Sequence, residues 1–175
     1  MNLISRKDIG RVLERHVLDS LTGAQHIQGN RIVDIGSGAG LPGVPLAIMS
    51  PQAQFVLVDR MARRVRFLEE VKRRLALDNI HPLLADGTEL SGEPFDMAIA
   101  RAVATVPEVW DMVHAGLTRD GRLLVYSATD FQADEVTSAQ DLTRWASDQG
   151  LKAEVKSVTV PLLDRQHVLV EIRRQ

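Results

Sequence analysis

A glycine series at residues 36–40 is the stretch of this sequence that most directly indicates a binding site. It follows the β-rich run Arg31–Ile35 and reads Gly36-Ser37-Gly38-Ala39-Gly40. Glycine lets the backbone turn sharply and approach a ligand where a Cβ atom would collide. In the dinucleotide-binding fingerprint the third glycine stands three residues after the second, and here that position is Leu41. The spacing disfavours a phosphate-binding loop and leaves two readings, a loop that wraps another ligand or a plain glycine-rich turn.

Polar residues also end the next two apolar runs. Asp59 closes the run FVLVD, 23 residues after Gly36, and a carboxylate at the tip of a second strand can accept both hydroxyls of a ribose. Asp86, Gly87 and Thr88 follow the run LLA, where they can accept the exocyclic amine of adenine, although a helix-cap or turn role for Asp86 is equally open. Parallel strands bind ligands outside their carboxyl ends. The three tips therefore predict a site for an adenosyl ligand.

Arg101 stands at the fourth strand tip, between two alanines, after the run FDMAIA. An arginine at such a position is costly to bury without an anionic partner. We expect it to contact the carboxylate of the ligand's methionine part or the target nucleotide, which makes it the single candidate catalytic residue. The alternative is an ion pair with Asp96 or Glu108.

The elements that must position these residues alternate between strands and helices, which predicts an α/β fold with a parallel sheet covered on both faces. The expected strands are Arg31–Ile35, Gln54–Val58, His81–Ala85, Phe95–Ala100, Arg122–Ser127, Lys152–Val160 and His167–Ile172. The expected helices are Lys7–Leu21, Gly43–Met49, Arg60–Leu77, Val106–Leu117 and Phe131–Gln149.

The last two expected strands are joined by VPLLDRQ, which is too short for a helical crossover, so they should pair as an antiparallel hairpin. This ending suits the class I S-adenosylmethionine-dependent methyltransferase fold, a Rossmann-like, seven-stranded and mostly parallel sheet. With 175 residues and no linker-like stretch, we expect one domain over residues 1–175, with residues 1–29 as an N-terminal helical cap.

Composition narrows the chemistry. The chain has no cysteine, which excludes disulfides and the thiol nucleophile that carbon-5 methylation of pyrimidines needs. The Asn/Asp-Pro-Pro-aromatic motif typical of enzymes that methylate exocyclic amines is absent after Ala100, and Lys152 and Lys156 lie far away on the late hairpin. Ring nitrogens remain, and guanine N7 already has an in-plane lone pair that needs positioning more than a base. No apolar leader or membrane-length run is present, so we expect a cytoplasmic protein with no membrane or metal partner.

Charge is unevenly distributed along the chain. Residues 1–74 carry 12 Lys and Arg against 7 Asp and Glu, a net charge of +5, and the remainder carries −7. In the helix expected over residues 60–77, an apolar stripe should face the sheet, and Glu69–Arg73 and Glu70–Arg74 are favourable i,i+4 pairs. The stripe comprises Met61, Val65, Leu68, Val71 and Leu75. The helix's arginines are either a solvated surface or a contact for RNA phosphates. Tyr126 either stacks on a base or packs in the core.

Several stretches resemble the bacterial 16S ribosomal RNA guanine-N7 methyltransferase family, also called the glucose-inhibited division protein B family. The most specific is GSGAGLPGVPLAI, because Pro42, Gly43 and Pro45 are not shared by methyltransferases in general. RHVLDSL, RVRFLEEV, FDMAIARAVA and VPLLDRQHVLVEI also match. Within RHVLDSL, we expect His16 and Asp19 to serve helix packing and capping. The sequence is identified as a short, divergent member of this family.

The resemblance implies S-adenosylmethionine (SAM) as cofactor, 16S ribosomal RNA or the small ribosomal subunit as partner, and a monomer. The residues expected to contact the cofactor are Gly36, Ser37, Gly38, Gly40, Leu41, Asp59, Asp86, Gly87, Thr88 and Arg101. The sequence departs from the family where Ser127-Ala128 replaces a Lys-Gly pair on the substrate side. Two alternatives therefore remain, a methyltransferase of the same fold acting on a small molecule and a non-catalytic module that binds the cofactor or the ribosome.

Overall fold

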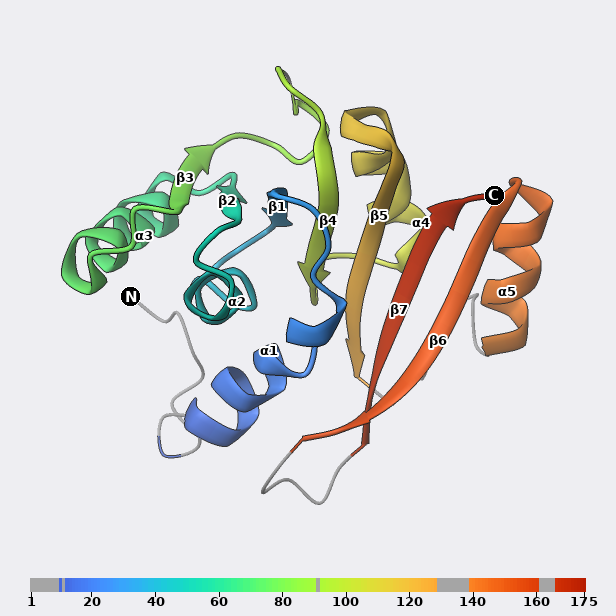
Figure 1. Cartoon of the computed structure of the whole chain (residues 1–175), viewed down its shortest axis with the longest axis horizontal. Helices are drawn as coiled ribbons and strands as arrows, with labels where there is room; N and C mark the ends of the chain where they lie inside the picture. The colour runs from blue at the N-terminus through green and yellow to red at the C-terminus, as the bar shows by residue number, and fades with distance from the viewer. Residues whose placement is uncertain (1–9, 11, 91, 129–138, 161–165) are drawn as a thin grey trace.

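A seven-stranded sheet in the order β3-β2-β1-β4-β5-β7-β6 forms the centre of the computed structural model of the chain (Figure 1). The structure describes residues 10, 12–90, 92–128, 139–160 and 166–175. The strands are β1 (Arg31–Ile35), β2 (Gln54–Asp59), β3 (Ile80–Leu84), β4 (Phe95–Arg101), β5 (Leu117–Ala128), β6 (Leu151–Thr159) and β7 (Gln166–Arg174). All seven expected strands are present, and most end within two residues of the expected position.

Strand direction divides the sheet into two parts. β3, β2, β1, β4 and β5 run parallel, so their carboxyl ends lie at one edge. β7 lies antiparallel between β5 and β6, which confirms the expected hairpin. The main error in the strand prediction is β5, which starts at Leu117 and not at Arg122 because its first residues pair with β4 at Phe95.

Helices cover both faces of the parallel part. α2 (Gly43–Met49) packs on the face that carries Ile32, Phe55 and Leu57, whereas α4 (Val106–Val113) packs on the face that carries Val33 and Val58. α5 (Ala139–Asp148) lies on the same face as α4 but packs against β6, in the antiparallel part. The expected helix at residues 106–117 is interrupted after Val113 by the 3-10 turn η4 (His114–Gly116). Of the helix expected at residues 131–149, positions 131–138 lie outside the described residues.

The N-terminal region is helical from η2 (Leu13–Leu18), a π-helical segment, through α1 (Asp19–Leu21) to the 3-10 turn η3 (Ala24–His26). Positions 7–9 and 11 of the expected helix at residues 7–21 lie outside the described residues. The segment is tied to the sheet through Tyr126, whose side chain is buried and whose hydroxyl donates a hydrogen bond of 2.6 Å to the backbone oxygen of Ser20. The core-packing alternative for Tyr126 is therefore confirmed.

α3 (Ala62–Leu75) corrects two expectations. Of its expected apolar stripe, Leu68 is fully buried, but Met61 is 45% and Leu75 53% exposed because they lie at or before the helix ends. The expected pair of Glu69 with Arg73 is also wrong. Arg73 instead pairs with Glu70, three residues away, and Arg74 pairs with the same carboxylate.

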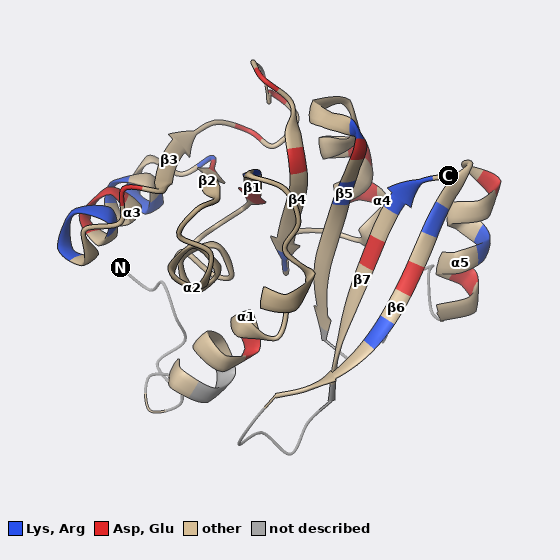
Figure 2. Ribbon diagram, in the orientation of Figure 1, with Lys and Arg blue, Asp and Glu red and all other residues tan. Residues whose placement is uncertain are grey.

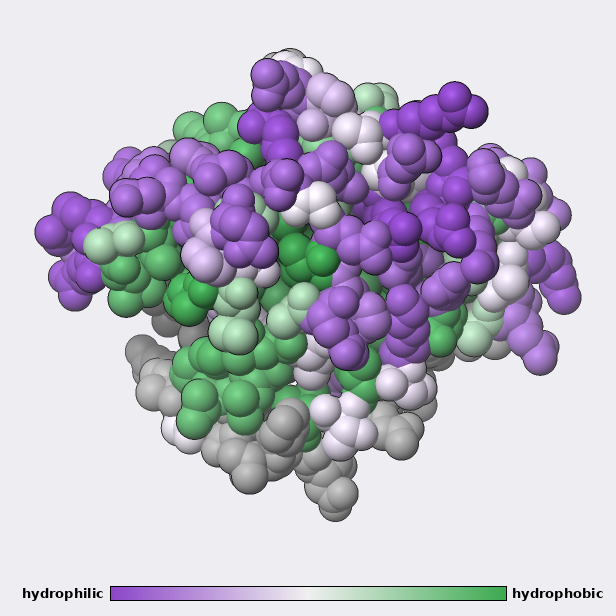
Figure 3. Space-filling model, in the orientation of Figure 1, coloured by the Kyte–Doolittle hydropathy of each residue, from purple (hydrophilic) through white to green (hydrophobic). Residues whose placement is uncertain are grey.

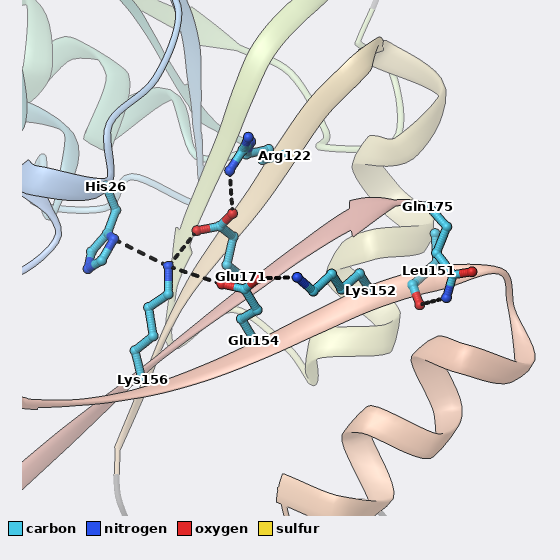
Figure 4. Close-up of polar contacts among 8 residues, drawn as sticks. All are labelled: His26, Arg122, Leu151, Lys152, Glu154, Lys156, Glu171 and Gln175. Atoms are coloured by element: carbon cyan, nitrogen blue, oxygen red, sulfur yellow. Dashed lines mark hydrogen bonds and ion pairs between the residues drawn. The ribbon is translucent and has the colours of Figure 1, made fainter.

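The antiparallel part carries a polar network on one face of the sheet (Figure 4). Glu171 of β7 is 3% exposed and accepts hydrogen bonds from Arg122 of β5 at 2.7 Å and Lys156 of β6 at 2.8 Å. Burial by itself would raise the pKa of Glu171, but these two cations outweigh it and the pKa is lowered. Lys152 pairs with Glu154 beside them. Both lysines of the late hairpin are therefore occupied within the sheet.

The surface has charged regions and an apolar region (Figures 2 and 3). Charged side chains of both signs follow α3, β6 and β7, whereas apolar surface gathers over α2 and the N-terminal helical segment beside it. Ile48 and Met49 of α2 are 51% and 59% exposed. Within the described residues, no helix is long and apolar enough to cross a membrane.

Candidate functional site

The glycine loop between β1 and α2 has the backbone that the sequence predicts. Gly36, Gly38 and Gly40 have φ angles of +64°, +56° and +83°, a region that L side chains rarely adopt. A Cβ atom on Gly40 would lie 2.6 Å from Val44, and one on Gly36 would lie 2.8 Å from Val103. The loop therefore needs glycine at all three positions for its turn, and at Gly36 and Gly40 also for its close packing.

Asp34, a buried residue of β1, holds this loop through hydrogen bonds. Its side chain is fully buried and its Oδ2 accepts a hydrogen bond of 3.1 Å from the backbone N–H of Gly43, while the Ser37 hydroxyl donates to the Asp34 backbone oxygen at 3.0 Å. Burial raises the pKa of Asp34 to about 7, against the lowering effect of these contacts and of the nearby Arg101 charge. Ser37 is thus directed toward the core, where it holds the loop in shape.

Asp59 joins the loop to the end of β2. Its buried carboxylate accepts three hydrogen bonds: from the backbone N–H of Gly38 at 3.0 Å, from the backbone N–H of Met61 at 2.9 Å, and from Arg64 at 3.1 Å. The contact with Gly38 fixes the carboxylate against the glycine loop. The sequence therefore placed Asp59 correctly beside the loop, but gave no sign of its pairing with Arg64.

A pocket of about 330 Å³ opens at these strand tips, within the size range of small-ligand sites. It is lined by Ile35, Gly36, Val58, Asp59, Arg60, Arg64, Ala85, Asp86, Gly87, Ala102, Val103 and Met112. Four of the ten expected cofactor residues are therefore brought together: Gly36, Asp59, Asp86 and Gly87. They come from the ends of β1, β2 and β3, as parallel strands require.

The other six expected residues lie outside this lining. Ser37, Gly38, Gly40 and Leu41 form the turn itself, in which the N–H groups of Gly40 and Leu41 donate to the Ser37 oxygen at 2.7 and 3.1 Å. Thr88 donates from its backbone N–H and its hydroxyl to Asp86 at 3.1 and 2.9 Å, so Asp86 has the turn role as well as a place in the pocket wall. The sixth residue, Arg101, has a partner of its own.

Arg101 is paired with Asp19 of α1, whose Oδ2 lies 3.0 Å from its Nη1. The two ion-pair partners expected for Arg101, Asp96 and Glu108, are both wrong. Asp96 instead accepts from the backbone N–H groups of Asn30 and Arg31, and Glu108 forms a capping box with Thr105 at the start of α4. The anion that a partly buried arginine requires is thus supplied by the N-terminal helix.

Pocket residues that the sequence did not indicate come from three places in the chain. Ile35, Val58 and Ala85 stand next to expected residues on the same strands, so their position along the chain is a usable signal. Arg60, in the turn before α3, and Arg64, in its first turn, add positive charge to one wall. Met112 reaches the pocket from α4, and only the packing of that helix on the sheet brings it there.

Comparison with solved structures defines the class of protein. The fold resembles magnesium protoporphyrin IX methyltransferase from Synechocystis, a structure with bound SAM, at a TM-score of 0.63 and 20% identity over 91% of this chain and 76% of that chain. It also resembles precorrin-6y C5,15-methyltransferase from Geobacter metallireducens, at a TM-score of 0.65 and 15% identity over 99% of this chain and 91% of that chain. The chain has the class I SAM-dependent methyltransferase fold, as its sheet predicted.

Sequence comparison then defines the family. The pattern of the GidB family, rRNA small subunit methyltransferase G, matches residues 1–168. Ribosomal RNA small subunit methyltransferase G of Francisella philomiragia is 36% identical over 99% of this chain and 80% of its own length, and that of Shigella flexneri is 37% identical over 98% and 80%. The chain belongs to the GidB family, and it is a SAM-dependent rRNA methyltransferase.

The residues present fit this cofactor. The Cβ that Gly38 lacks would meet only the Gly36 backbone, at 3.7 Å, so the loop leaves open space at the point nearest Asp59. The pocket beside it offers carboxylates at the tips of β2 and β3 for a ribose and an adenine amine, with apolar walls from Ile35, Val103 and Met112. This mixture of a few convergent polar groups and an apolar lining is typical of cofactor sites.

Proposed function

We propose that the protein methylates N7 of a guanine in 16S ribosomal RNA by direct in-line transfer. SAM supplies a methyl group on a positively charged sulfur, so attack by the N7 lone pair breaks the carbon–sulfur bond and leaves its electron pair on sulfur. The reaction requires no removal of a proton from the base. The protein's contribution is therefore to hold the two reactants in line and to exclude water.

The pocket's own charges carry this proposal. Its two carboxylates, Asp59 and Asp86, already accept hydrogen bonds from donors of their own turns and, for Asp59, also from the glycine loop. They are suited to holding the cofactor and not to abstracting a proton. A site built in this way matches a nucleophile that is already unprotonated, as guanine N7 is at neutral pH.

We assign the cofactor-binding residues as follows. The loop of Gly36, Ser37, Gly38, Gly40 and Leu41 wraps the amino-acid part, Asp59 accepts the ribose hydroxyls, and the turn of Asp86, Gly87 and Thr88 accepts the adenine amine. Arg101, beside the pocket wall, is the candidate catalytic residue, and its charge faces the methionine carboxylate or the target nucleotide. The support for this assignment is the convergence of three strand tips on one pocket.

The same proposal gives the partner an approach surface. Arg60 and Arg64 line the pocket, and Arg63 and Arg66 are exposed on the adjoining surface of α3. Their positive charge can neutralise RNA phosphates beside the target base. We expect the protein to act as a cytoplasmic monomer on the small ribosomal subunit or its RNA. The relatives named as rRNA methyltransferases favour this substrate over a small molecule.

The test is methyl transfer to small ribosomal subunits that lack the modification. Purified protein is incubated with such subunits and methyl-labelled SAM, and the RNA is digested to nucleosides for mass spectrometry. We expect label in N7-methylguanosine with the wild-type protein and none with Asp59→Asn. Asp78→Asn, at an exposed aspartate in the turn between α3 and β3, serves as the matched control. Label in another nucleoside, or none in RNA although the cofactor binds, would contradict the proposal.

A further inference from the structure

Asp19 joins three parts of the chain that are far apart in the sequence. Its side chain is 6% exposed, and its two oxygens lie beside two different basic side chains. Oδ2 lies 3.0 Å from Arg101 at the end of β4, and Oδ1 lies 2.7 Å from Nδ1 of His167 near the start of β7. Sequence reasoning assigned Asp19 only to helix packing and capping, but these contacts place it beside the strand tips that form the site.

The backbone that follows Arg101 forms a wall of the cofactor pocket. Ala102 has a φ angle of +54°, a left-handed conformation that costs energy for any residue with a Cβ atom. This turn directs Ala102 and Val103 into the pocket lining, and a Cβ atom on Gly36 would lie 2.8 Å from Val103. A strained turn persists only when its surroundings hold it, and the residue immediately before it is fixed by Asp19.

The charge of Arg101 also acts on the residue that holds the glycine loop. The Arg101 charge lies close enough to the fully buried Asp34, below the glycine loop, to lower the pKa of that carboxyl against the effect of burial. Asp19 therefore balances an arginine that stands between the glycine loop on β1 and the turn after β4. A second tie between the N-terminal segment and the sheet is the hydrogen bond from Tyr126 to Ser20. Tyr126 pairs with Arg101 across β4 and β5, but its hydroxyl donates to the Ser20 backbone oxygen and not into the Asp19–Arg101 pair.

We propose that Asp19 is a positioning residue for methyl transfer: its carboxylate holds Arg101, and through Arg101 the turn at Ala102 and Val103 that closes the cofactor pocket. The proposal rests on the proposed function of this pocket. If Asp19 has this role, tight cofactor binding requires the N-terminal helix α1 to be docked on the sheet.

The experiment measures the affinity for S-adenosylhomocysteine by calorimetry, well below the unfolding temperature, together with hydrogen exchange of a peptide spanning residues 98–106. Asp19→Asn should weaken binding by about tenfold or more and accelerate exchange in this peptide. Tyr126→Phe is the matched control, because it breaks the other tie of the same segment. It should lower the unfolding temperature while the affinity stays within about twofold of the wild type.

A double-mutant cycle isolates the pair. Asp19→Asn combined with Arg101→Gln should bind no more weakly than the worse single variant, because both changes break one interaction. If Asp19→Asn does not fold, Asp19→Glu replaces it, since it keeps the charge but moves the carboxylate by one methylene, and it should weaken binding by at least about threefold.

The inference is overturned by an unchanged affinity in the Asp19 variant, by an equal loss in Tyr126→Phe, or by additive effects of the two substitutions. These outcomes are distinct from failure of the proposed function, which would appear as absent cofactor binding or absent RNA methylation by the wild-type protein itself.

Discussion

Asp59 and Asp19 are two buried aspartates at the same edge of one sheet, and they are held in different ways. Asp59 takes its partners from the loop beside it and from its own turn and helix, namely the N–H groups of Gly38 and Met61 and the side chain of Arg64. Asp19 takes its partners from β4 and β7. The partner nearer to it in the sequence, Arg101, is 82 residues away. The first carboxylate is organised by local structure and the second by the assembled sheet.

This difference shows which contacts hold each half of the pocket in place. The half formed by β1, β2 and β3 is a set of short strand-to-helix turns, and the side-chain hydrogen bonds of Asp34, Asp59 and Asp86 in it join residues at most 21 positions apart. The half formed by the turn after β4 depends on an ion pair that exists only once the N-terminal helix has docked. Variants in the two halves should therefore fail differently, the first through ligand contacts and the second through stability and assembly.

Asp59→Ala should give the largest effect. It removes the proposed ribose acceptor and also the acceptor for the N–H groups of Gly38 and Met61, so we expect about 100-fold weaker binding of S-adenosylhomocysteine. Calorimetry measures the affinity, and Asp78→Ala is the control at an exposed site. An affinity equal to that of the wild type would contradict the assignment of Asp59 to the ribose, and with it the expectation that variants of the β1–β3 half fail through ligand contacts.

Gly23→Ala tests the long-range half at a point away from the pocket. The new Cβ atom would overlap the Tyr126 hydroxyl, so the N-terminal segment must shift off the sheet. We expect a loss of about 2 kcal/mol in the free energy of unfolding, measured by urea denaturation. Gly92→Ala lies where a Cβ atom meets no neighbour within 4 Å, although its φ of +99° carries its own backbone strain. Gly23 itself has a φ of −84°, which alanine adopts without strain, so an unchanged stability in Gly23→Ala would show that the contact with Tyr126 does not hold this segment on the sheet.

Asp34→Asn tests the electrostatics beneath the glycine loop. Burial raises the pKa of Asp34 from 3.8 to about 7, so the folded state keeps a proton that the unfolded state releases above pH 4. The wild type should therefore lose stability relative to Asp34→Asn as the pH rises from 4 to 7, by about 1 kcal/mol per pH unit, with no further change above that range. Denaturation curves at pH 5, 6 and 7 measure this. Parallel profiles of the two proteins would show that Asp34 is ionised throughout.

Glu70→Gln should give the smallest effect. Arg73 and Arg74 lower the pKa of Glu70 to about 2, but all three groups lie at the surface of α3, where water and salt screen them. The unfolding temperature should change by less than about 2 °C in scanning calorimetry. Stronger binding of RNA by this variant, because two arginines are released, would extend the proposed phosphate contact along α3.

Much of the fold and about half of the site follow from local patterns in the sequence. Strand β1 and helix α2 lie where the sequence placed them, because a β-branched run followed by glycines and a proline-containing helix leaves few alternatives. Asp59 and Asp86 were found because each ends a short apolar run. Arg101 was found as well, but its partner was wrong, since a sequence does not show which distant carboxylate reaches a strand tip.

By itself, the sequence determined the order of the elements, the backbone of the glycine loop and the class of cofactor, because turns, strand tips and glycine conformations depend on neighbouring residues. Only the tertiary structure decided that Asp19 pairs with Arg101, that Met112 enters the pocket and that Lys156 is occupied by Glu171. The physical reason is that a buried charge is stable only beside its partner, and the partner is chosen by packing. The conformation of the glycine loop thus depends on neighbouring residues, whereas the pocket wall at Ala102 and Val103 depends on contacts between distant parts of the chain.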